Sequence, residues 1–139
     1  MRRRRLLGAM LCAVAIGACN NNSTSGTVSA PTTTRTTETF SGTVQVGSSA
    51  FHSFPVAQPG TTDVTLTTTS PSSTVVMGLA VGTTGEGACT PLAGASTNVV
   101  AGSTPQITGL TTTGTLCVQI RDIGQATGPV SYTISVTHP

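Results

Sequence analysis

The chain contains no lysine and no tryptophan, and only 7% of its 139 residues are charged. The whole chain has a formal charge of +2, but four of its six basic residues form the run Arg2–Arg5. The rest of the chain sets Arg35 and Arg121 against four carboxylates and carries a formal charge of −2. Proteins that bind nucleic acid by releasing counterions need clustered lysine and arginine. The sequence therefore excludes a nucleic-acid partner and predicts a surface whose polarity comes from threonine and serine.

Long hydrophobic runs are also absent. The apolar run Leu6–Ala18 has 13 uncharged residues, whereas a transmembrane helix needs about 20. A run of this length behind a positively charged start is typical of a secretory signal peptide. Arg3–Leu7 also loosely matches a twin-arginine export signal, so both export routes stay open. We expect residues 1–18 to be removed after export.

The residues Ile16-Gly17-Ala18-Cys19 lie at the end of this apolar run. They resemble the lipobox of bacterial lipoproteins, in which two small residues separate an aliphatic residue from the cysteine. The resemblance implies cleavage before Cys19, diacylglyceryl transfer to its sulfur, and a lipid anchor in the bacterial cell envelope. Asn20 stands where an Asp signals inner-membrane retention in enteric bacteria, so the outer membrane is preferred. The alternative is an ordinary signal peptidase site with Cys19 as a free or paired thiol.

Four cysteines are present, and two of them belong to the N-terminal segment. Cys12 leaves with the signal peptide, and Cys19 is the predicted lipid attachment point. Cys89 and Cys117 remain, and two cysteines in an oxidising compartment are expected to pair. A redox or metal site is the alternative, but neither a C-x-x-C spacing nor clustered histidines accompany them. We predict a structural disulfide that holds a Gly-rich loop around Cys89 against the outside of a sheet.

Beyond residue 37, apolar residues alternate with polar ones and never follow a helical period. Residues 19–37 are polar and irregular, and they are predicted to form a flexible tether. Residues 38–138 contain seven or eight short period-two runs bounded by turn residues, a pattern typical of half-buried antiparallel strands. The sequence therefore predicts an all-β fold, an antiparallel two-sheet sandwich. The residues expected to face its core are Phe40, Val44, Val46, Phe54, Val56, Val64, Leu66, Val75, Met77, Leu79, Val81, Leu116, Val118, Ile120, Tyr132, Ile134 and Val136.

Many of the expected core residues, together with Gly60, Gly114 and Thr115, occur in a recognisable order along the chain. The order is F-x-V…G…V-x-L, L-x-V, G-T-x-x-V-x-I and Y-x-I-x-V. The residues are Phe54, Val56, Gly60, Val64, Leu66, Leu79, Val81, Gly114, Thr115, Val118, Ile120, Tyr132, Ile134 and Val136. This order resembles the bacterial pre-peptidase C-terminal domain over about residues 38–138. The resemblance implies a jelly-roll-like sandwich that serves as an accessory module, usually appended to secreted proteases and other hydrolases. Two features depart from the family, since no enzyme precedes the domain and Leu116 replaces the aromatic residue that usually follows the Gly-Thr pair.

Residues that carry chemistry are few, and none forms a recognisable catalytic motif. The only histidines are His52, expected on the outer face of a strand, and His138, expected to be frayed at the chain end. A Ser-His-Asp triad could be written from His52 and Asp63 or Asp122, but no G-x-S-x-G elbow accompanies it. A glycosidase pair of Glu86 and Asp122, or a calcium site at Asp63 or Asp122, fits poorly with four scattered carboxylates. We therefore expect no enzymatic activity, no cofactor and no metal.

The predicted function is that of a non-catalytic envelope lipoprotein whose β-sandwich is an interaction or structural module. Its expected contact with the membrane is the N-terminal lipid, and its protein or glycan partner is left open. If it binds a ligand, the candidate residues are His52, Gln119 and Arg121 on an exposed sheet, or the loop Gly85–Gly94. The alternative is a carbohydrate- or substrate-binding module that works beside a secreted hydrolase, for which Phe51 is the one aromatic residue expected at the surface.

Overall fold

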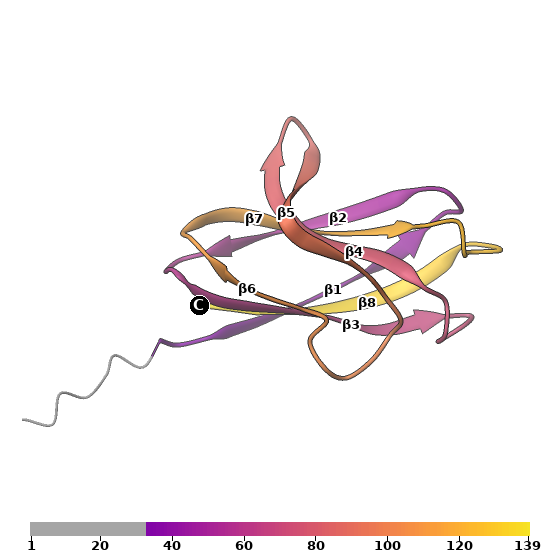
Figure 1. Cartoon of the computed structure of the whole chain (residues 1–139), viewed down its shortest axis with the longest axis horizontal. Helices are drawn as coiled ribbons and strands as arrows, with labels where there is room; N and C mark the ends of the chain where they lie inside the picture. The colour runs from indigo at the N-terminus through magenta and orange to yellow at the C-terminus, as the bar shows by residue number, and fades with distance from the viewer. Residues whose placement is uncertain (1–32) are drawn as a thin grey trace, which may run out of the picture. The chain divides into compact units, whose positions relative to one another are not determined.

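A computed structural model describes residues 33–139 of the chain (Figure 1). The predicted signal peptide, the lipobox and most of the predicted tether lie outside the described residues and stay predictions. The first strand begins at Thr36, two residues before the predicted domain boundary at Glu38. Thr36 and Thr37 thus belong to a strand and not to the tether. Residues 33–139 contain no helix with the length and apolarity that a membrane crossing requires.

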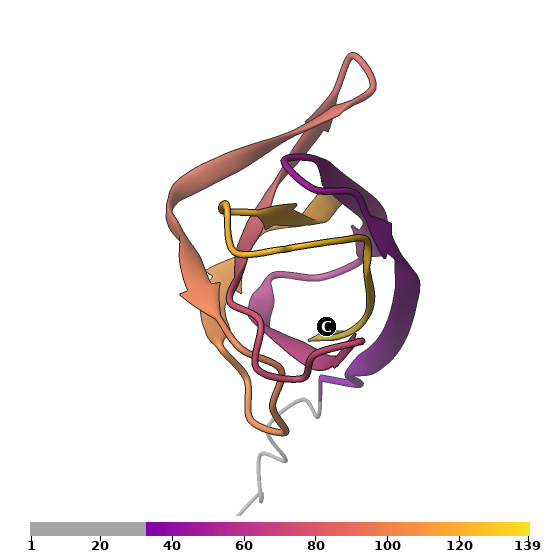
Figure 2. The same cartoon turned by 90° about the vertical axis from the view of Figure 1, so that its right-hand side faces the viewer.

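The described residues form eight β-strands in two antiparallel sheets. Sheet A has the strand order β1-β8-β3-β6, and sheet B has the order β2-β7-β4-β5. The two sheets face each other around a common core (Figure 2). The all-β sandwich predicted from the alternating runs is therefore confirmed. The strands are β1 (Thr36–Val44), β2 (Ser49–Val56), β3 (Gly60–Ser70), β4 (Met77–Gly85), β5 (Ala88–Val99), β6 (Ile107–Thr111), β7 (Gly114–Asp122) and β8 (Val130–His138).

Strand pairing follows a single scheme in which the first half of the domain lies against the second half. β1 pairs with β8, β2 with β7, β3 with β6 and β4 with β5, always antiparallel. Contacts of β3 with β8 and of β4 with β7 then complete the two sheets. A long hairpin that is folded over in this way is an eight-stranded jelly roll. The jelly-roll-like architecture is therefore confirmed as well.

The core consists of the residues on the apolar phase of each strand. In β8 the buried positions alternate along the whole strand with half-buried or exposed Ser and Thr. Each large aliphatic side chain in this layer stabilises the fold by roughly 1.5–3 kcal/mol. The predicted core residues that are buried are Val44, Phe54, Val56, Val64, Leu66, Met77, Leu79, Val81, Leu116, Val118, Ile120, Tyr132, Ile134 and Val136.

Three residues of the predicted core lie elsewhere. Val46 is 54% exposed, because β1 ends at Val44 and Val46 falls in the turn that leads to β2. Phe40 and Val75 are only partly buried and pack against the core from its periphery. Phe40 lies on an edge strand of sheet A, and Val75 precedes β4. At Val46 and Val75 the alternating pattern therefore continues beyond the ends of β1 and β4.

The hairpin of β4 and β5 extends away from the two layers (Figures 1 and 2), and a disulfide ties it to β7. The Cα atoms of Cys89 and Cys117 are 5.9 Å apart, although β4 lies between β5 and β7 in the sheet. Gly82 of β4 permits this approach, because a side chain there would collide with the backbone of Thr90. The predicted disulfide is confirmed and lies on the outside of sheet B. The prediction of a Gly-rich loop was wrong, since Cys89 lies within strand β5.

Candidate functional site

His52 faces the interior, so the prediction that it lies on an outer face was wrong. It is in phase with the buried Phe54 on β2, and its ring stacks on Phe40 with centroids 4.9 Å apart. The Nε2 atom of His52 is hydrogen-bonded to the Tyr132 hydroxyl at 2.8 Å, and Gly42 leaves the room that the Tyr132 ring occupies. Partial burial lowers the pKa of His52, because the imidazolium loses hydration. His52 therefore links sheet B to sheet A.

His138 is buried, and the prediction that it is frayed was wrong. Strand β8 pairs with β1 along its whole length, so that His138 stands opposite Thr36. The imidazole ring lies 5.3 Å from the ring of Phe54, and its Nε2–H donates to the Glu38 carboxylate at 2.9 Å. Both histidines are thus engaged within the fold.

Asp63 belongs to a polar cluster on the outer face of sheet A. Its carboxylate accepts hydrogen bonds from the Arg35 guanidinium at 2.7 Å and from the Thr108 hydroxyl at 2.8 Å. The Arg35 hydrogen bond, followed by that of Thr108, lowers the pKa of Asp63. Arg35 also donates to the backbone carbonyls of Thr61 and Thr137. The positive charge of Arg35 is therefore compensated within the domain.

Asp122 connects the turn between β1 and β2 with the segment that follows β7. Its Oδ2 atom accepts a hydrogen bond from the backbone N–H of Gly47 at 2.8 Å. Its Oδ1 atom accepts from the N–H groups of Gly124, Gln125 and Ala126 at 2.9, 3.0 and 3.1 Å. These hydrogen bonds, that of Gly47 above all, lower the pKa of Asp122. Asp122 is thus a structural carboxylate whose oxygens are occupied by backbone donors.

The remaining acidic residue, Glu86, is far from these groups. Glu86 lies at the tip of the β4–β5 hairpin, whereas Asp122 pairs with Met77 at the opposite end of β4. Along the strand this separation is roughly 30 Å, while the carboxylates of a glycosidase are about 5–10 Å apart. Asp63 and Asp122 accept their hydrogen bonds from groups other than histidine. Between residues 33 and 139, no three His, Cys, Asp or Glu side chains are grouped as a metal ion would require.

The outer face of sheet A is covered by Ser and Thr side chains that bond to one another. Four outward pairs of such residues stand opposite each other on β1 and β8, and three of the four are hydrogen-bonded. The bonded pairs are Thr37–Thr137 (2.9 Å), Ser41–Thr133 (3.1 Å) and Thr43–Ser131 (3.3 Å). Together with the ion pair of Arg35 and Asp63, they leave most polar groups of this face satisfied by the domain itself.

On the outer face of sheet B, longer polar side chains stand beside small residues. Gln119 of β7 lies opposite Ala80 of β4, and Arg121 lies opposite Gly78. The register extends these pairs into two rows across the four strands, Phe51–Gln119–Ala80–Ser96 and Ser49–Arg121–Gly78–Asn98. Within the described part of the chain, none of these outward side chains is hydrogen-bonded to another group. We call five of these residues the open face: Phe51, Ser96, Asn98, Gln119 and Arg121.

Arg121 is the cation of the open face. Its side chain lies across Gly78, because a Cβ atom at that position would be 2.8 Å from both Cγ and Nε of Arg121. Arg121, Ser96 and Asn98 line a shallow depression of about 200 Å³. Among residues 33–139 Arg121 forms no ion pair, whereas Arg35 is bound to Asp63. The open face therefore combines an uncompensated positive charge with free hydrogen-bonding groups.

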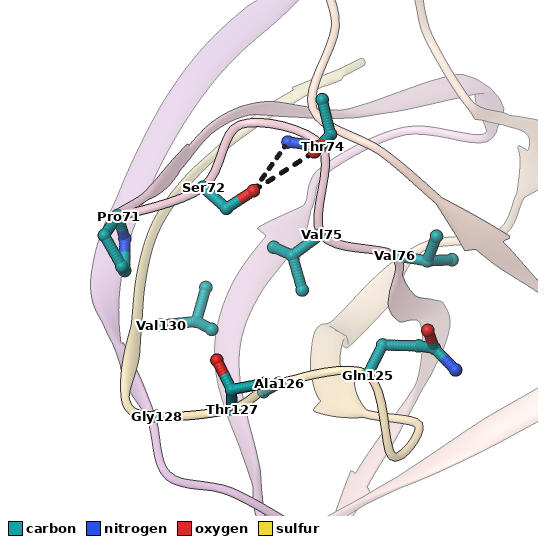
Figure 3. A pocket seen from close by; sticks show the side chains of 10 residues that line it. All are labelled: Pro71, Ser72, Thr74, Val75, Val76, Gln125, Ala126, Thr127, Gly128 and Val130. Carbon is teal, nitrogen blue, oxygen red and sulfur yellow. Dashed lines mark hydrogen bonds between the residues drawn. The ribbon is translucent and has the colours of Figure 1, made fainter.

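A second concave region lies at one end of the sandwich, where the β3–β4 and β7–β8 connections face each other (Figure 3). Its volume is about 340 Å³. The Ser72 hydroxyl is hydrogen-bonded to the Thr74 hydroxyl at 3.1 Å and accepts a hydrogen bond from the Thr74 backbone N–H at 3.3 Å, as the two dashed lines in Figure 3 show. The walls are uncharged and are formed by Pro71, Ser72, Thr74, Val75, Val76, Gln125, Ala126, Thr127, Gly128 and Val130. This end cavity has room for a small neutral molecule but holds no titratable side chain.

No protein-family model, no curated protein and no solved structure matches the chain. The resemblance to the pre-peptidase C-terminal domain and to the lipobox therefore stays a prediction. The fold is established by the structure itself, and the function must be inferred from the surface that the fold presents.

The structure brings some of the predicted binding residues together and separates others. Gln119 and Arg121 lie side by side on the open face, and Phe51, which is 36% exposed, lies beside them. His52 faces the opposite side of the same sheet. The segment Gly85–Gly94 belongs to the β4–β5 hairpin and is largely a strand.

Sequence reasoning missed Ser96, Asn98 and the end cavity. β5 is exposed at most of its positions, so its residues show no alternation that would assign a face. One usable pattern is present in β4, where Gly78, Ala80 and Gly82 occupy every second position. Small residues on the polar phase of a strand indicate that other groups approach its backbone closely.

Proposed function

We propose that this chain is a non-catalytic binding module of the bacterial cell envelope, held at the membrane by a lipid on Cys19. The charged start, the short apolar run and the lipobox-like residues 16–19 support export followed by lipidation. Asn20 in place of Asp supports the outer membrane as the destination. The membrane contact is the lipid, and the jelly roll supplies the contact with other molecules.

The contrast between the two outer faces carries the binding proposal. Ser and Thr on sheet A satisfy each other, whereas the open face on sheet B leaves its polar groups without a partner in the described domain. The open face offers a guanidinium group, two amides, a hydroxyl and an aromatic ring. Such groups recognise a ligand through hydrogen bonds and stacking.

The roles of the ionisable residues support a non-catalytic function. His52 is bonded to Tyr132, His138 to Glu38, and the Asp122 carboxylate accepts four backbone hydrogen bonds. A general acid or base must instead reach a substrate proton. These side chains contribute to the fold, and Glu86 stands alone on the hairpin.

A second candidate function is that of a carbohydrate- or substrate-binding module that acts beside a secreted hydrolase. Phe51 favours it, because an exposed aromatic ring beside the amide of Gln119 is suited to stack on a sugar. The resemblance to the pre-peptidase C-terminal domain supports the partnership with a hydrolase. In this function the open face would bind the substrate and the enzyme would be a separate chain.

Replacing Cys19 tests the anchor. Cys19→Ala should end labelling by radioactive fatty acid and release the protein from membranes, while the matched variant Cys12→Ala should stay labelled and membrane-bound. A Cys19→Ala protein that remains labelled in the membrane fraction would contradict the lipid assignment.

Blocking one face at a time tests the binding role. Ser96→Trp places a large ring on the open face, and Thr39→Trp places the same ring on the outer face of sheet A, both at exposed strand positions. Binding to isolated cell walls and to a printed glycan array should fall at least about tenfold in Ser96→Trp and stay unchanged in Thr39→Trp. Equal binding by both variants would contradict a role for the open face.

A further inference from the structure

We propose that the open face binds an acidic oligosaccharide, with a ligand carboxylate on Arg121 and a sugar ring on Phe51. This inference rests on the proposed binding function and names its ligand class. It is carried by three features of sheet B: the charge of Arg121, the way its side chain is held, and the groups that surround it.

The distribution of charge favours an anionic ligand. Arg35 is paired with Asp63, and Glu38 with His138. Asp122 lies directly beside Arg121 in sequence but points to the other side of β7, where backbone N–H groups surround it. Arg121 is therefore the one cationic side chain of the described domain without an acidic neighbour bound to it. A carboxylate is the natural partner, because a guanidinium binds it through two parallel hydrogen bonds.

The position of the Arg121 side chain is set by its neighbours. Its stem lies over Gly78, where the missing Cβ leaves space, and the side chain of Ile123 borders the same space. The side chain therefore runs from β7 across β4, toward the depression that Asn98 and Ser96 help to line. A ligand carboxylate on Arg121 would place neighbouring hydroxyl groups within reach of the Asn98 amide and the Ser96 hydroxyl.

Phe51 and Gln119 extend the site on the other side of Arg121. Phe51 lies directly opposite Gln119, and Arg121 is two residues further along β7. Diagonal neighbours on adjacent strands are about 7–8 Å apart, and the four strands from β2 to β5 span about 14–15 Å. A short oligosaccharide can cover this surface, with one ring on Phe51 and a charged substituent on Arg121.

The same geometry is less suited to a peptide. The backbones of β7 and β4 are fully used in the sheet, so that no strand edge is offered at the centre of the open face. The surface has one aromatic ring, small residues and no apolar pocket for peptide side chains. Sugars instead present hydroxyl groups to amides and an apolar C–H face to an aromatic ring. The open face therefore fits a carboxylated sugar better than an acidic peptide.

The experiment uses an array of oligosaccharides that carry uronic, sialic or muramic carboxylates, each printed beside its methyl ester. The wild-type protein should bind at least one acid at least about tenfold more tightly than its ester, with an affinity that falls as salt is raised. Isothermal titration calorimetry with that acid should then show a loss of about 10- to 100-fold for Arg121→Gln. Arg35→Gln, a matched change on sheet A, should have no effect.

Two further variants separate the parts of the site. Phe51→Ala should weaken the binding of the acid and of its ester by the same factor. Gly78→Ala keeps the charge but displaces the Arg121 stem, and it should weaken only the acid. An acidic peptide on the same array, bound more tightly than every acidic sugar, would overturn the choice of ligand.

The inference is also overturned if no acidic glycan binds, if acid and ester bind equally, or if Arg121→Gln binds as the wild type does. The comparison of Ser96→Trp with Thr39→Trp distinguishes this failure from failure of the proposed function. If Ser96→Trp still blocks binding to cell walls, the open face is a binding site with another ligand. If it does not, the proposed function fails as well.

Discussion

Loss of the Cys89–Cys117 disulfide should remove a large part of the stability of the domain. The bond joins residues 28 positions apart. In the chain-entropy model, closing a loop of this length stabilises the folded state by about 3.6 kcal/mol. A domain of this size has a total unfolding free energy of about 5–15 kcal/mol. The disulfide should therefore supply between about a quarter and about 70% of the unfolding free energy of the domain.

Urea denaturation followed by circular dichroism measures this effect, with two forms of the protein compared with the oxidised wild type. The reduced wild type keeps both sulfur atoms, so it should lose about 3–4 kcal/mol from loop entropy alone. The Cys89→Ala/Cys117→Ala variant also loses packing around Cys117, which is completely buried, and should lose about 1 kcal/mol more. A reduced protein within about 1 kcal/mol of the oxidised one would refute the reasoning. The hairpin would then be held by its β4 pairing and not by the disulfide.

Three further predictions concern residues that hold the fold. Because burial lowers the pKa of His52 below its ordinary 6.5, the unfolded chain takes up the proton first as pH falls. The contribution of His52 to the unfolding free energy should thus be fully present above pH 6.5 and decrease below it. The variant His52→Gln should lack this decrease in urea titrations carried out at a series of pH values. Asp122→Ala should speed amide hydrogen exchange at residues 124–126, and unchanged rates there would contradict its role. Gly82→Ala should lower the unfolding free energy by about 1–3 kcal/mol, since its Cβ would meet the Thr90 backbone. An unfolding free energy equal to that of the wild type would show that β5 can shift freely.

Most of the fold could be predicted because its signal is local. A half-buried strand alternates apolar and polar residues, and β3, β7 and β8 do so along most of their length. The pattern fails for β5, where most residues are exposed and Pro, Gly and Ala resemble a loop. β5 is a strand because β4 supplies its hydrogen bonds, and that contact is not visible in the β5 sequence.

The two histidines show how a correct pattern can be overruled by a general expectation. The alternation that buries Phe54 also places His52 on the inward side, and the alternation of β8 continues from Val136 to His138. The polar character of His52 and the terminal position of His138 led instead to the prediction that both are exposed. The structure satisfies both rings with specific partners, a Tyr132 hydroxyl and a Glu38 carboxylate, which removes the reason for them to face water.

The open face depends on register, which composition cannot supply. Both sheets expose Ser, Thr and small residues, so their strands look alike as sequences. Antiparallel pairing sets each outward hydroxyl of β1 opposite an outward hydroxyl of β8, and two short side chains at that distance can bond to each other. On sheet B the pairing of β7 with β4 sets Gln119 opposite Ala80 and Arg121 opposite Gly78, and neither of these small residues has a polar group to bond. The long polar groups of sheet B therefore have no partner within the described domain, and this difference comes from the pairing register more than from residue content.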